Sequence, residues 1–199
     1  MCDLPLRVEE IRRAMLDRLI GREIQLLETT RSTNDAILDC ITKETAAGIV
    51  VFAETQTAGR GQRGNVWESA VRKGLWLSVL LRPQIALTDS IPLTSWAAAC
   101  VCQTLLQFGV EAIMKAPNDI LVGDRKIAGV LIEMRAQPKA PHLAIVGIGV
   151  NVNQLPQDFS RAVRDRATSF AIIRGCSVDR TAVAISLLRR LDDAYRRYA

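Results

Sequence analysis

Short apolar runs recur along the chain, and they constrain its fold more than any other feature. Two of them predict strands: a short buried strand at Gly48–Ala53 and a second apolar strand at Gly74–Leu81. Further strands are expected at Glu23–Leu27, Ala112–Lys115, Ile120–Val122, Lys126–Met134 and Leu143–Val150. Strands that are grouped in this way, with helices between them, favour a mixed sheet packed on helices.

Helical spacing of apolar residues separates these strands. It predicts a helix over Val8–Leu19, a second helix that begins after an N-cap at Ser32, and a central helix from residues 88–89 to about Phe108. From Ala162 to the end the pattern is again helical. The core face of this last region is expected at Val183, Ile185, Leu187, Leu188 and Leu191.

Composition indicates an ordinary globular domain. The 199 residues are 49% hydrophobic and 24% charged, and no linker divides them, so one domain over residues 1–199 is expected. The net charge of +5 is scattered, which favours solvated helix faces over a nucleic-acid surface. Five cysteines without a CxxC pair, together with a charged rather than apolar beginning, predict a reduced cytoplasmic protein with no membrane partner.

The chain has one histidine, His142, in a polar stretch before an apolar strand. A surface position is the expected reading for it. Because this lone histidine is expected at the surface, the chemistry is expected to rest on neither a Ser-His-Asp arrangement nor a histidine metal site.

Four segments concentrate glycine, hydroxyl, amide and cationic residues beside the predicted strand ends. They are RSTND at Arg31–Asp35, ETQTAGRGQRGNVW at Glu54–Trp67, KAPNDILVGDRKIAGVLIE at Lys115–Glu133, and GIGVN at Gly147–Asn151. Each alone also has a simple structural reading, as a helix cap, a flexible loop, a turn or a close strand crossing. The second segment belongs to a longer stretch, Glu54–Lys73, in which apolar residues do not recur at a regular period. This stretch is expected to be a loop, and long loops inside compact domains are usually functional.

Together and in this order, the four segments resemble the catalytic domain of the biotin protein ligases. The resemblance runs from about Ile24 to Asn153. It implies a fold of the α/β (α+β) type, with a mixed sheet flanked by helices, related to class II aminoacyl-tRNA synthetases. It also implies a two-step reaction, in which ATP activates biotin as biotinyl-AMP and a lysine of a biotin carboxyl carrier protein then accepts the biotin.

The resemblance assigns roles to individual residues. Lys126 and Arg60 are the implied catalytic cations, since a carboxylate must meet a polyphosphate. The implied biotin-binding residues are Ser32, Thr33, Asn34, Gln56, Gly59, Arg60, Lys126, Gly129 and Gly149. The implied ATP- and adenylate-binding residues are Arg60, Gln62, Arg63, Trp67, Asn118, Asp119, Lys126 and Asn151. Asp119 is the candidate ligand of a Mg²⁺ held mainly by phosphates.

Two positions depart from the family. Gln62 stands where many members have Arg, which predicts weaker retention of the adenylate unless Arg63 compensates. Ala116 stands where the family has Trp in KWPND, and a buried indole covers about 150–250 Å². Either a cavity beside the pocket or neighbours that have moved inward are therefore expected, and an engineered change is a third explanation.

The domain organisation also differs from that of many members. Neither an N-terminal helix-turn-helix domain nor a C-terminal SH3-like domain is expected in this chain. Family members often pair through sheet edges, so a homodimer is a hypothesis. The Glu54–Lys73 loop is expected to be mobile without ligand, because its charged side chains lack a partner until a phosphate arrives.

Two alternatives stay open. One is a lipoate or octanoate ligase, which shares the fold, although its Arg-Arg-x-x-Gly-Gly-Gly loop is missing here. The other is a non-catalytic module that binds biotin or biotinyl-AMP as a sensor.

Overall fold

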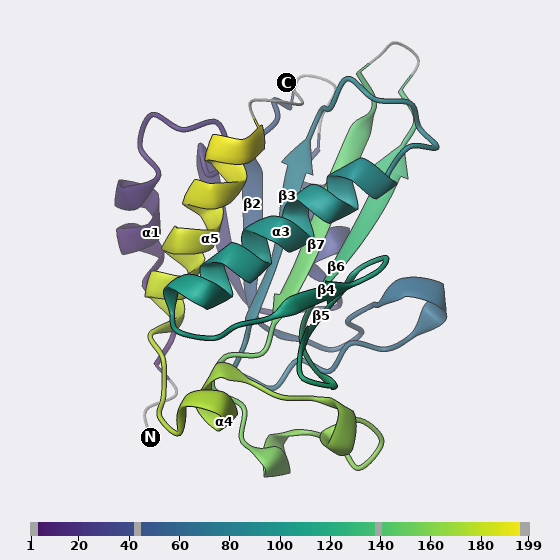
Figure 1. Cartoon of the computed structure of the whole chain (residues 1–199). Coiled ribbons are helices and arrows are strands. Elements are labelled where there is room, and N and C mark those ends of the chain that lie inside the picture. The colour runs from purple at the N-terminus through teal and green to yellow at the C-terminus, as the bar shows by residue number, and fades with distance from the viewer. Residues whose placement is uncertain (1–3, 42–44, 138–140, 196–199) are drawn as a thin grey trace.

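A mixed β-sheet forms the centre of the computed structural model, which describes residues 4–41, 45–137 and 141–195 (Figure 1). Within these residues the sheet has seven strands in the order β1-β2-β3-β7-β6-β5-β4. Their bounds are β1 Glu23–Thr30, β2 Ile49–Gln56, β3 Leu75–Leu81, β4 Ile113–Lys115, β5 Asp119–Val122, β6 Arg125–Arg135 and β7 Leu143–Val150. β1 and β2 are parallel and all other pairs are antiparallel, which confirms the predicted mixed sheet.

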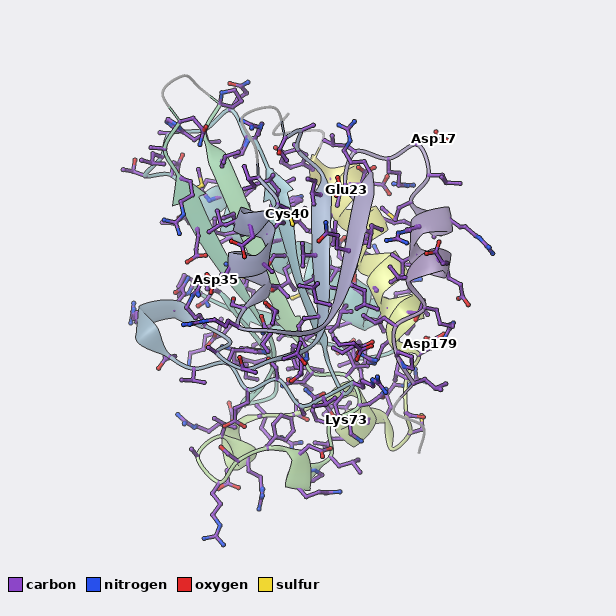
Figure 2. The ribbon with its side chains drawn as sticks, turned by 180° about the vertical axis from the view of Figure 1, so that it is seen from behind. Asp17, Glu23, Asp35, Cys40, Lys73 and Asp179 are labelled. Atoms are coloured by element: carbon purple, nitrogen blue, oxygen red, sulfur yellow. The ribbon has the colours of Figure 1, made fainter. Side chains whose placement is uncertain are left out.

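Helices cover both faces of this sheet. Their bounds are α1 Val8–Ala14, α2 Thr33–Asp39, α3 Ile91–Gln107, α4 Phe170–Arg174 and α5 Arg180–Tyr195. The helices α1, α3 and α5 lie on the face seen in Figure 1, whereas α2 lies on the opposite face, turned toward the viewer in Figure 2. Within the described ranges, no helix combines the length and the apolar character that a membrane span requires.

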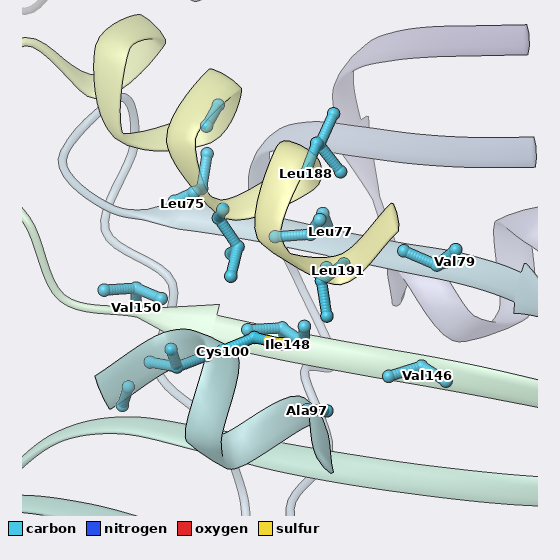
Figure 3. Packing of buried hydrophobic residues seen from close by; sticks show 14 of the residues in the cluster. Leu75, Leu77, Val79, Ala97, Cys100, Val146, Ile148, Val150, Leu188 and Leu191 are labelled. Atoms are coloured by element: carbon cyan, nitrogen blue, oxygen red, sulfur yellow. The ribbon is translucent and has the colours of Figure 1, made fainter. Parts of the chain in front are cut away.

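The main core lies between the sheet and the helices α1, α3 and α5. Leu75, Leu77 and Val79 of β3 point toward α3 and α5, where they meet Ile148 of β7 and Leu191 of α5 (Figure 3). All seven residues of β3 are buried, so this central strand contacts packed side chains on both of its faces. The apolar strand predicted at Gly74–Leu81 is therefore confirmed.

The opposite face of β3 carries the residues between these. Leu80 joins a smaller apolar cluster with Ile37 of α2 and Ile145 of β7. Since side chains alternate along a strand, Trp76 and Ser78 share this face with Leu80. The face covered by α2 is thus apolar at one end and polar at the other.

The first predicted helix, Val8–Leu19, is too long. It ends at Ala14 with Met15 as its C-cap, and Asp17 then adopts a left-handed backbone with φ 64°. This turn buries Ile20 completely, and the Ile20 amide donates to the Asp192 carboxylate at 2.9 Å. The chain turns early because it has to enter β1 at Glu23.

The predicted continuous helical region after Ala162 is also wrong. A 3-10 turn at Arg164–Arg166 and the short helix α4 precede α5, and Gly175 ends α4 with φ 69°. The segment before α4 is extended because the Thr168 amide donates to the carbonyl oxygen of Lys126 at 2.9 Å. The expected core face of α5 is confirmed for Val183, Leu187, Leu188 and Leu191, whereas Ile185 is half-buried.

Candidate active site

Glycines on two neighbouring strands hollow out the sheet beneath the start of α2. Gly149 of β7 pairs with Trp76 of β3 on one side and with Gly129 of β6 on the other. The next aligned row holds Ser78 and Gly147, and both rows face α2. Glycine has no side chain, so these neighbouring glycines leave room above the sheet. The strand register, which brings them together, thereby creates a depression here.

Residues from all four polar segments line the pocket over this depression. Its lining consists of Ser32, Thr33, Asn34, Gln56, Arg60, Gly61, Trp67, Asn118, Lys126, Gly129, Val130, Leu131, Gly147, Ile148 and Gly149. The structure therefore brings together segments that are more than a hundred residues apart in sequence. His142 lies outside this lining, half-buried before β7, where its Nδ1 accepts from the Gln137 amide at 3.2 Å.

The first turn of α2 supplies one polar wall of the pocket. Ser32 is the N-cap, and its hydroxyl accepts from the Asn34 amide at 3.3 Å. Gln56 at the end of β2 braces the same turn, because its Oε1 accepts from the Thr33 amide at 2.8 Å. The Gln56 Nε2 donates to Ser69 Oγ at 3.0 Å. Gln56 thus links α2 to the loop that follows β2.

Asn34 connects α2 to the sheet through residues that the sequence interpretation did not select. Its Nδ2 donates to Glu133 Oε2 at 2.9 Å, and its Oδ1 accepts from Ser78 Oγ at 2.5 Å. A Cβ on Gly147 would lie 2.4 Å from Asn34 Oδ1, so this glycine leaves the space that the amide occupies. A lone hydroxyl in the apolar run GLWLSVLL is the signal that could have pointed to Ser78.

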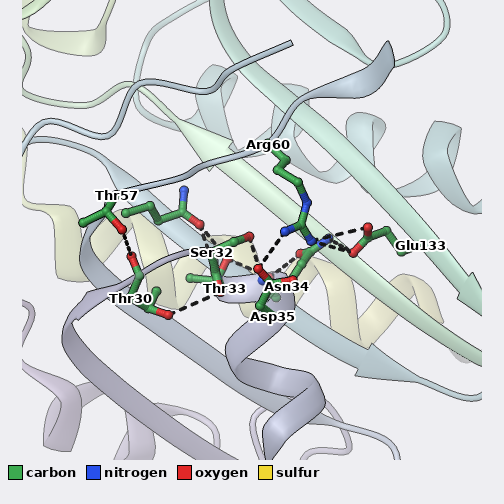
Figure 4. Close-up of polar contacts among 10 residues, drawn as sticks. Thr30, Ser32, Thr33, Asn34, Asp35, Thr57, Arg60 and Glu133 are labelled. Atoms are coloured by element: carbon green, nitrogen blue, oxygen red, sulfur yellow. Dashed lines mark hydrogen bonds and ion pairs between the residues drawn. The ribbon is translucent and has the colours of Figure 1, made fainter. Parts of the chain in front are cut away.

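Arg60 projects from the loop after β2 toward two carboxylates (Figure 4). The loop forms a small hairpin in which Arg60 bridges Val66. Arg60 Nη1 lies 2.7 Å from Asp35 Oδ2, and Nη2 lies 3.3 Å from Glu133 Oε2. The hydrogen bond from Arg60 lowers the pKa of Asp35, and the one to Asp35 raises the pKa of Arg60. The expectation that this charge has no partner before a phosphate arrives is therefore wrong for Arg60.

Lys126 provides a second cation at the opposite wall. Its Nζ lies 2.6 Å from Asp119 Oδ1 and 5.1 Å from the centroid of the Trp67 ring, within reach of a cation–π contact. The β5–β6 register shifts at Ile120/Leu121, beside Lys126, and such bulges re-aim side chains. The Lys126 side chain is one-third exposed, so a ligand that enters the pocket can contact it.

Trp67 occupies the space above the two central glycines. A Cβ on Gly129 or on Gly149 would come 3.0 Å or 2.5 Å from its indole. The ring also meets Trp76 edge to face, with centroids 6.1 Å apart. A ligand that uses the space above Gly129 and Gly149 must therefore displace this indole.

Two of the expected adenylate-binding amides serve the protein scaffold. Asn118 is buried, and its Nδ2 donates to the Val130 carbonyl at 3.0 Å. The Asn151 side chain donates to the Thr168 carbonyl at 2.9 Å and accepts from Gln154 Nε2 at 2.9 Å. Asn118 lines the pocket, whereas Asn151 lies outside its lining.

The remaining expected residues of the loop also lie outside the pocket lining. Gln62 and Arg63 form a 3-10 turn at the tip of the hairpin, where Arg63 is exposed and has φ 57°. Gly59 is buried at the base, and a Cβ there would lie 2.5 Å from the carbonyl oxygen of Trp67. Gly59 therefore allows the hairpin to close under Trp67.

Ala116 does not occupy a buried site. It is exposed, joined to Pro117 by a cis peptide bond in the β4–β5 turn, and lies outside the pocket lining. The expectation of an internal cavity or of inward repacking is wrong here, because the space beside Ala116 is open to solvent. The burial of an indole cannot be assumed at this position.

Carboxylates near the pocket are too few to form a dedicated metal cage. Within the described residues, no group of three or more His, Cys, Asp or Glu could hold a metal ion. Asp119 is half-buried and already paired with Lys126. This donor set fits a Mg²⁺ that is carried mainly by substrate phosphates, with one carboxylate contribution.

Comparison with known proteins agrees with this geometry. Residues 26–151 match the model of the biotin/lipoate A/B protein ligase family. The bifunctional ligase/repressor BirA of Bacillus subtilis is 36% identical over 95% of this chain, and the chain spans 58% of that protein. The biotin–[acetyl-CoA-carboxylase] ligase of Mycobacterium tuberculosis is 32% identical, with 90% of this chain and 68% of that protein covered.

Solved structures give the same result. The biotin protein ligase of Aquifex aeolicus in complex with biotin and ATP superposes with a TM-score of 0.76 at 29% identity, covering 88% of this chain and 71% of that one. The Leishmania major enzyme in complex with biotinyl-5-AMP gives a TM-score of 0.68 at 26% identity, covering 89% and 76%. The expected fold is thereby confirmed, and the chain belongs to the biotin/lipoate A/B protein ligase family.

Proposed function

We propose that this chain is the catalytic domain of a biotin protein ligase. One observation carries the proposal: Lys126 and Arg60 flank the same pocket that Ser32 and Thr33 line with hydroxyl groups. The cations suit a carboxylate and a phosphate, and the hydroxyls suit the carbonyl and N–H groups of a cyclic urea. Biotin presents a carboxylate at one end and a cyclic urea at the other.

In the first step, a biotin carboxylate oxygen attacks the α-phosphorus of ATP. The bond to the β-phosphate oxygen breaks, so biotinyl-AMP and pyrophosphate form. Both reactants are anionic, and Lys126 and Arg60 lower their repulsion by holding oxygens of each. To do so, each cation exchanges a carboxylate partner, Asp119 or Asp35, for the incoming substrate.

In the second step, a lysine amine of the acceptor attacks the carbonyl carbon of the mixed anhydride. The bond to the phosphate oxygen breaks, AMP leaves, and the amine loses a proton. By family resemblance, the acceptor is a biotin carboxyl carrier protein. The partly exposed position of Lys126 supports this step, since the acceptor lysine must reach the anhydride from outside.

The adenylate end of the site is assigned by the same resemblance. Trp67, once displaced from the glycines, packs on adenine, while Asn118 and Asp119 lie near the phosphates. Asn151 and Arg63 complete the proposed adenylate set. Gln62 lacks the charge that many members have there, so we propose that this chain retains the adenylate less tightly. Mg²⁺, when bound to ATP, neutralises phosphate charge.

The wider setting is also proposed. We infer a cytoplasmic enzyme that binds neither nucleic acid nor membrane. A homodimer formed through a sheet edge is consistent with the topology, because β1 and β4 are the two edge strands.

Biotin-dependent exchange of labelled pyrophosphate into ATP tests the proposal. We expect exchange that requires biotin and Mg²⁺ and that lipoate does not support. Exchange with lipoate or octanoate instead assigns the chain to lipoate or octanoate ligation. Binding of biotin without any exchange identifies a non-catalytic module, and no binding of biotin contradicts the proposal outright.

A further inference from the structure

A buried serine lies behind the pocket wall. Ser78 of β3 is fully buried, and it lies beyond the lining residues of the pocket. Its Oγ is 2.7 Å from Thr33 Oγ1 and 2.5 Å from Asn34 Oδ1. Both partners line the pocket, and Thr33 is the one that can offer a hydroxyl group to a ligand there.

Counting protons fixes the direction of these hydrogen bonds. The Asn34 amide must present its oxygen to Ser78, because its Nδ2 donates to the Glu133 carboxylate, which only accepts. Ser78 therefore donates its single hydroxyl proton to Asn34 Oδ1. The short contact between Ser78 and Thr33 then requires the proton of Thr33, since Ser78 has none left.

This relay leaves Thr33 with lone pairs but no free proton. Its contact with Gln56 Oε1 is longer, at 3.2 Å, than the 2.7 Å contact with Ser78, so we assign the single proton of Thr33 to the shorter contact. Toward the pocket, Thr33 is consequently an acceptor only. Ser32 has the opposite character, because its Oγ accepts from the Asn34 amide and keeps its own proton for another partner.

We propose that Ser78 is a specificity-determining positioning residue, which acts through Thr33 to select a ligand ring that presents an N–H group. The inference rests on the proposed function, in which that ring is the cyclic urea of biotin. A ring oxygen or a dithiolane sulfur at the same place meets the lone pairs of Thr33 and makes no hydrogen bond. Ser78 thus determines which ring binds, although it does not itself contact the ligand.

The test compares biotin with its two cyclic carbamate analogues, each with one ureido N–H replaced by oxygen. Dissociation constants are measured by calorimetry without ATP, so that catalysis is not needed. We expect the parent protein to bind at least one analogue about tenfold more weakly than biotin, the typical effect of one lost neutral hydrogen bond. In Ser78→Ala, Thr33 can turn its proton toward the ring oxygen, so this ratio falls toward one.

Matched variants separate this role from a structural one. Thr33→Val removes the acceptor, and adding Ser78→Ala to it is expected to change the ratio no further, as a double-mutant cycle reveals. Thr104→Ala removes another buried hydroxyl, on α3, which donates to the Cys100 carbonyl in its own helix. It is expected to lower the melting temperature without changing the ratio. If Ser78→Ala does not fold, Ser78→Cys keeps a similar shape, and its sulfur accepts the Thr33 proton only weakly, so its ratio should fall in the same direction.

Each contrary result has a distinct meaning. A parent protein that binds biotin and both carbamates equally overturns the acceptor-only assignment. An unchanged ratio in a folded Ser78 variant, or additive effects of the Ser78 and Thr33 changes, shows that Ser78 does not act through Thr33. A parent protein that does not bind biotin overturns the proposed function together with this inference.

Discussion

Two kinds of ion pair begin within one short segment of the chain. Glu54 and Arg60 are six residues apart, on β2 and on the loop after it. Glu54 pairs with Arg180 at 2.8 Å, and the two side chains are 0% and 4% exposed. Arg60 pairs with Asp35 at 2.7 Å, and these side chains are 38% and 39% exposed. Similar chemistry thus occurs in opposite surroundings.

Both side chains of the buried pair have further partners within the protein. The Leu6 amide donates to Glu54 Oε1 at 2.6 Å, while Arg180 donates to the carbonyls of Gly74 at 2.9 Å and of Leu4 at 2.7 Å. The pair therefore ties the N-terminal segment, β2, the start of β3 and α5 together. It has no access for a ligand.

In the site, by contrast, each cation can exchange its carboxylate partner for a substrate. Asp35 and Glu133 hold Arg60, and Asp119 holds Lys126, in positions that solvent can reach. Exposed pairs of this kind contribute little to stability, because water and salt screen them. A substrate phosphate can therefore replace the carboxylates at small cost. The comparison suggests that burial separates structural charges from working charges in this protein.

Breaking the buried pair is expected to have the largest effect. Arg180→Met leaves the Glu54 carboxylate buried without its charge partner, and such changes cost about 3–5 kcal/mol of unfolding free energy. Urea unfolding followed by circular dichroism measures this loss. The double variant Glu54→Gln/Arg180→Met leaves no unpaired charge and should recover part of it. A loss of less than about 1 kcal/mol in the single variant contradicts the structural role of the pair.

Removing a working charge should reverse the pattern. Lys126→Ala is expected to lower the rate of biotin-dependent pyrophosphate exchange by about 10²–10³, because a preorganised cation is lost where charge accumulates. Its unfolding free energy should change little, since the side chains of the pair with Asp119 are 32% and 37% exposed and solvent screens them. Asp119→Asn removes the same pair but keeps the charge of Lys126, so its unfolding free energy measures what the pair alone contributes to stability. Full exchange activity in a folded Lys126→Ala variant rules out the assigned role.

Releasing Arg60 from its carboxylate should produce a smaller effect. Asp35→Asn removes the competitor of an incoming phosphate, so the apparent affinity for biotin plus ATP is expected to rise by up to about fivefold. An affinity that stays unchanged or falls means that Asp35 positions Arg60 instead of competing for it.

The same variant tests the titration of Asp35. Its pKa lies below the ordinary value of 3.8, chiefly because Arg60 donates a hydrogen bond to the carboxylate. A depressed carboxyl pKa contributes stability that is present above the unfolded pKa and is lost as the pH falls through the folded pKa. The stability difference between the parent and Asp35→Asn should thus be constant near neutral pH and shrink below about pH 4. A difference that grows on acidification contradicts the ion pair.

The sequence predicted the positions of strands and of site segments better than their contacts. Apolar runs located the strands because burial on both faces leaves a direct trace in composition, as in β3. The partners Ser78 and Glu133 could not be found, because their roles depend on strand register and on the placement of α2. The end of α1 was also missed, because the turn at Asp17 is accompanied by a long-range hydrogen bond from the Ile20 amide to Asp192, which local sequence does not reveal.

Ala116 shows the same limit at the rim of the site, and the smallest effect is expected there. The family Trp suggested a buried indole, yet the structure exposes Ala116 in the β4–β5 turn. A change at an exposed position usually alters stability by less than about 0.5 kcal/mol. The melting temperature of Ala116→Trp without ligand should accordingly stay close to that of the parent.

Ligand binding then decides what a tryptophan at this position does. Asn118, two residues along, lines the pocket, so an indole at position 116 can fold over a bound ligand and shield it from water. In that case Ala116→Trp binds biotin plus ATP more tightly than the parent, and its melting temperature rises only when both ligands are present. Unchanged binding means that the indole stays in solvent. A fall in melting temperature without ligand means that the β4–β5 turn is packed more closely than the exposure of Ala116 indicates. The contrast between buried structural contacts and exposed contacts in the site then does not hold at this edge of the pocket.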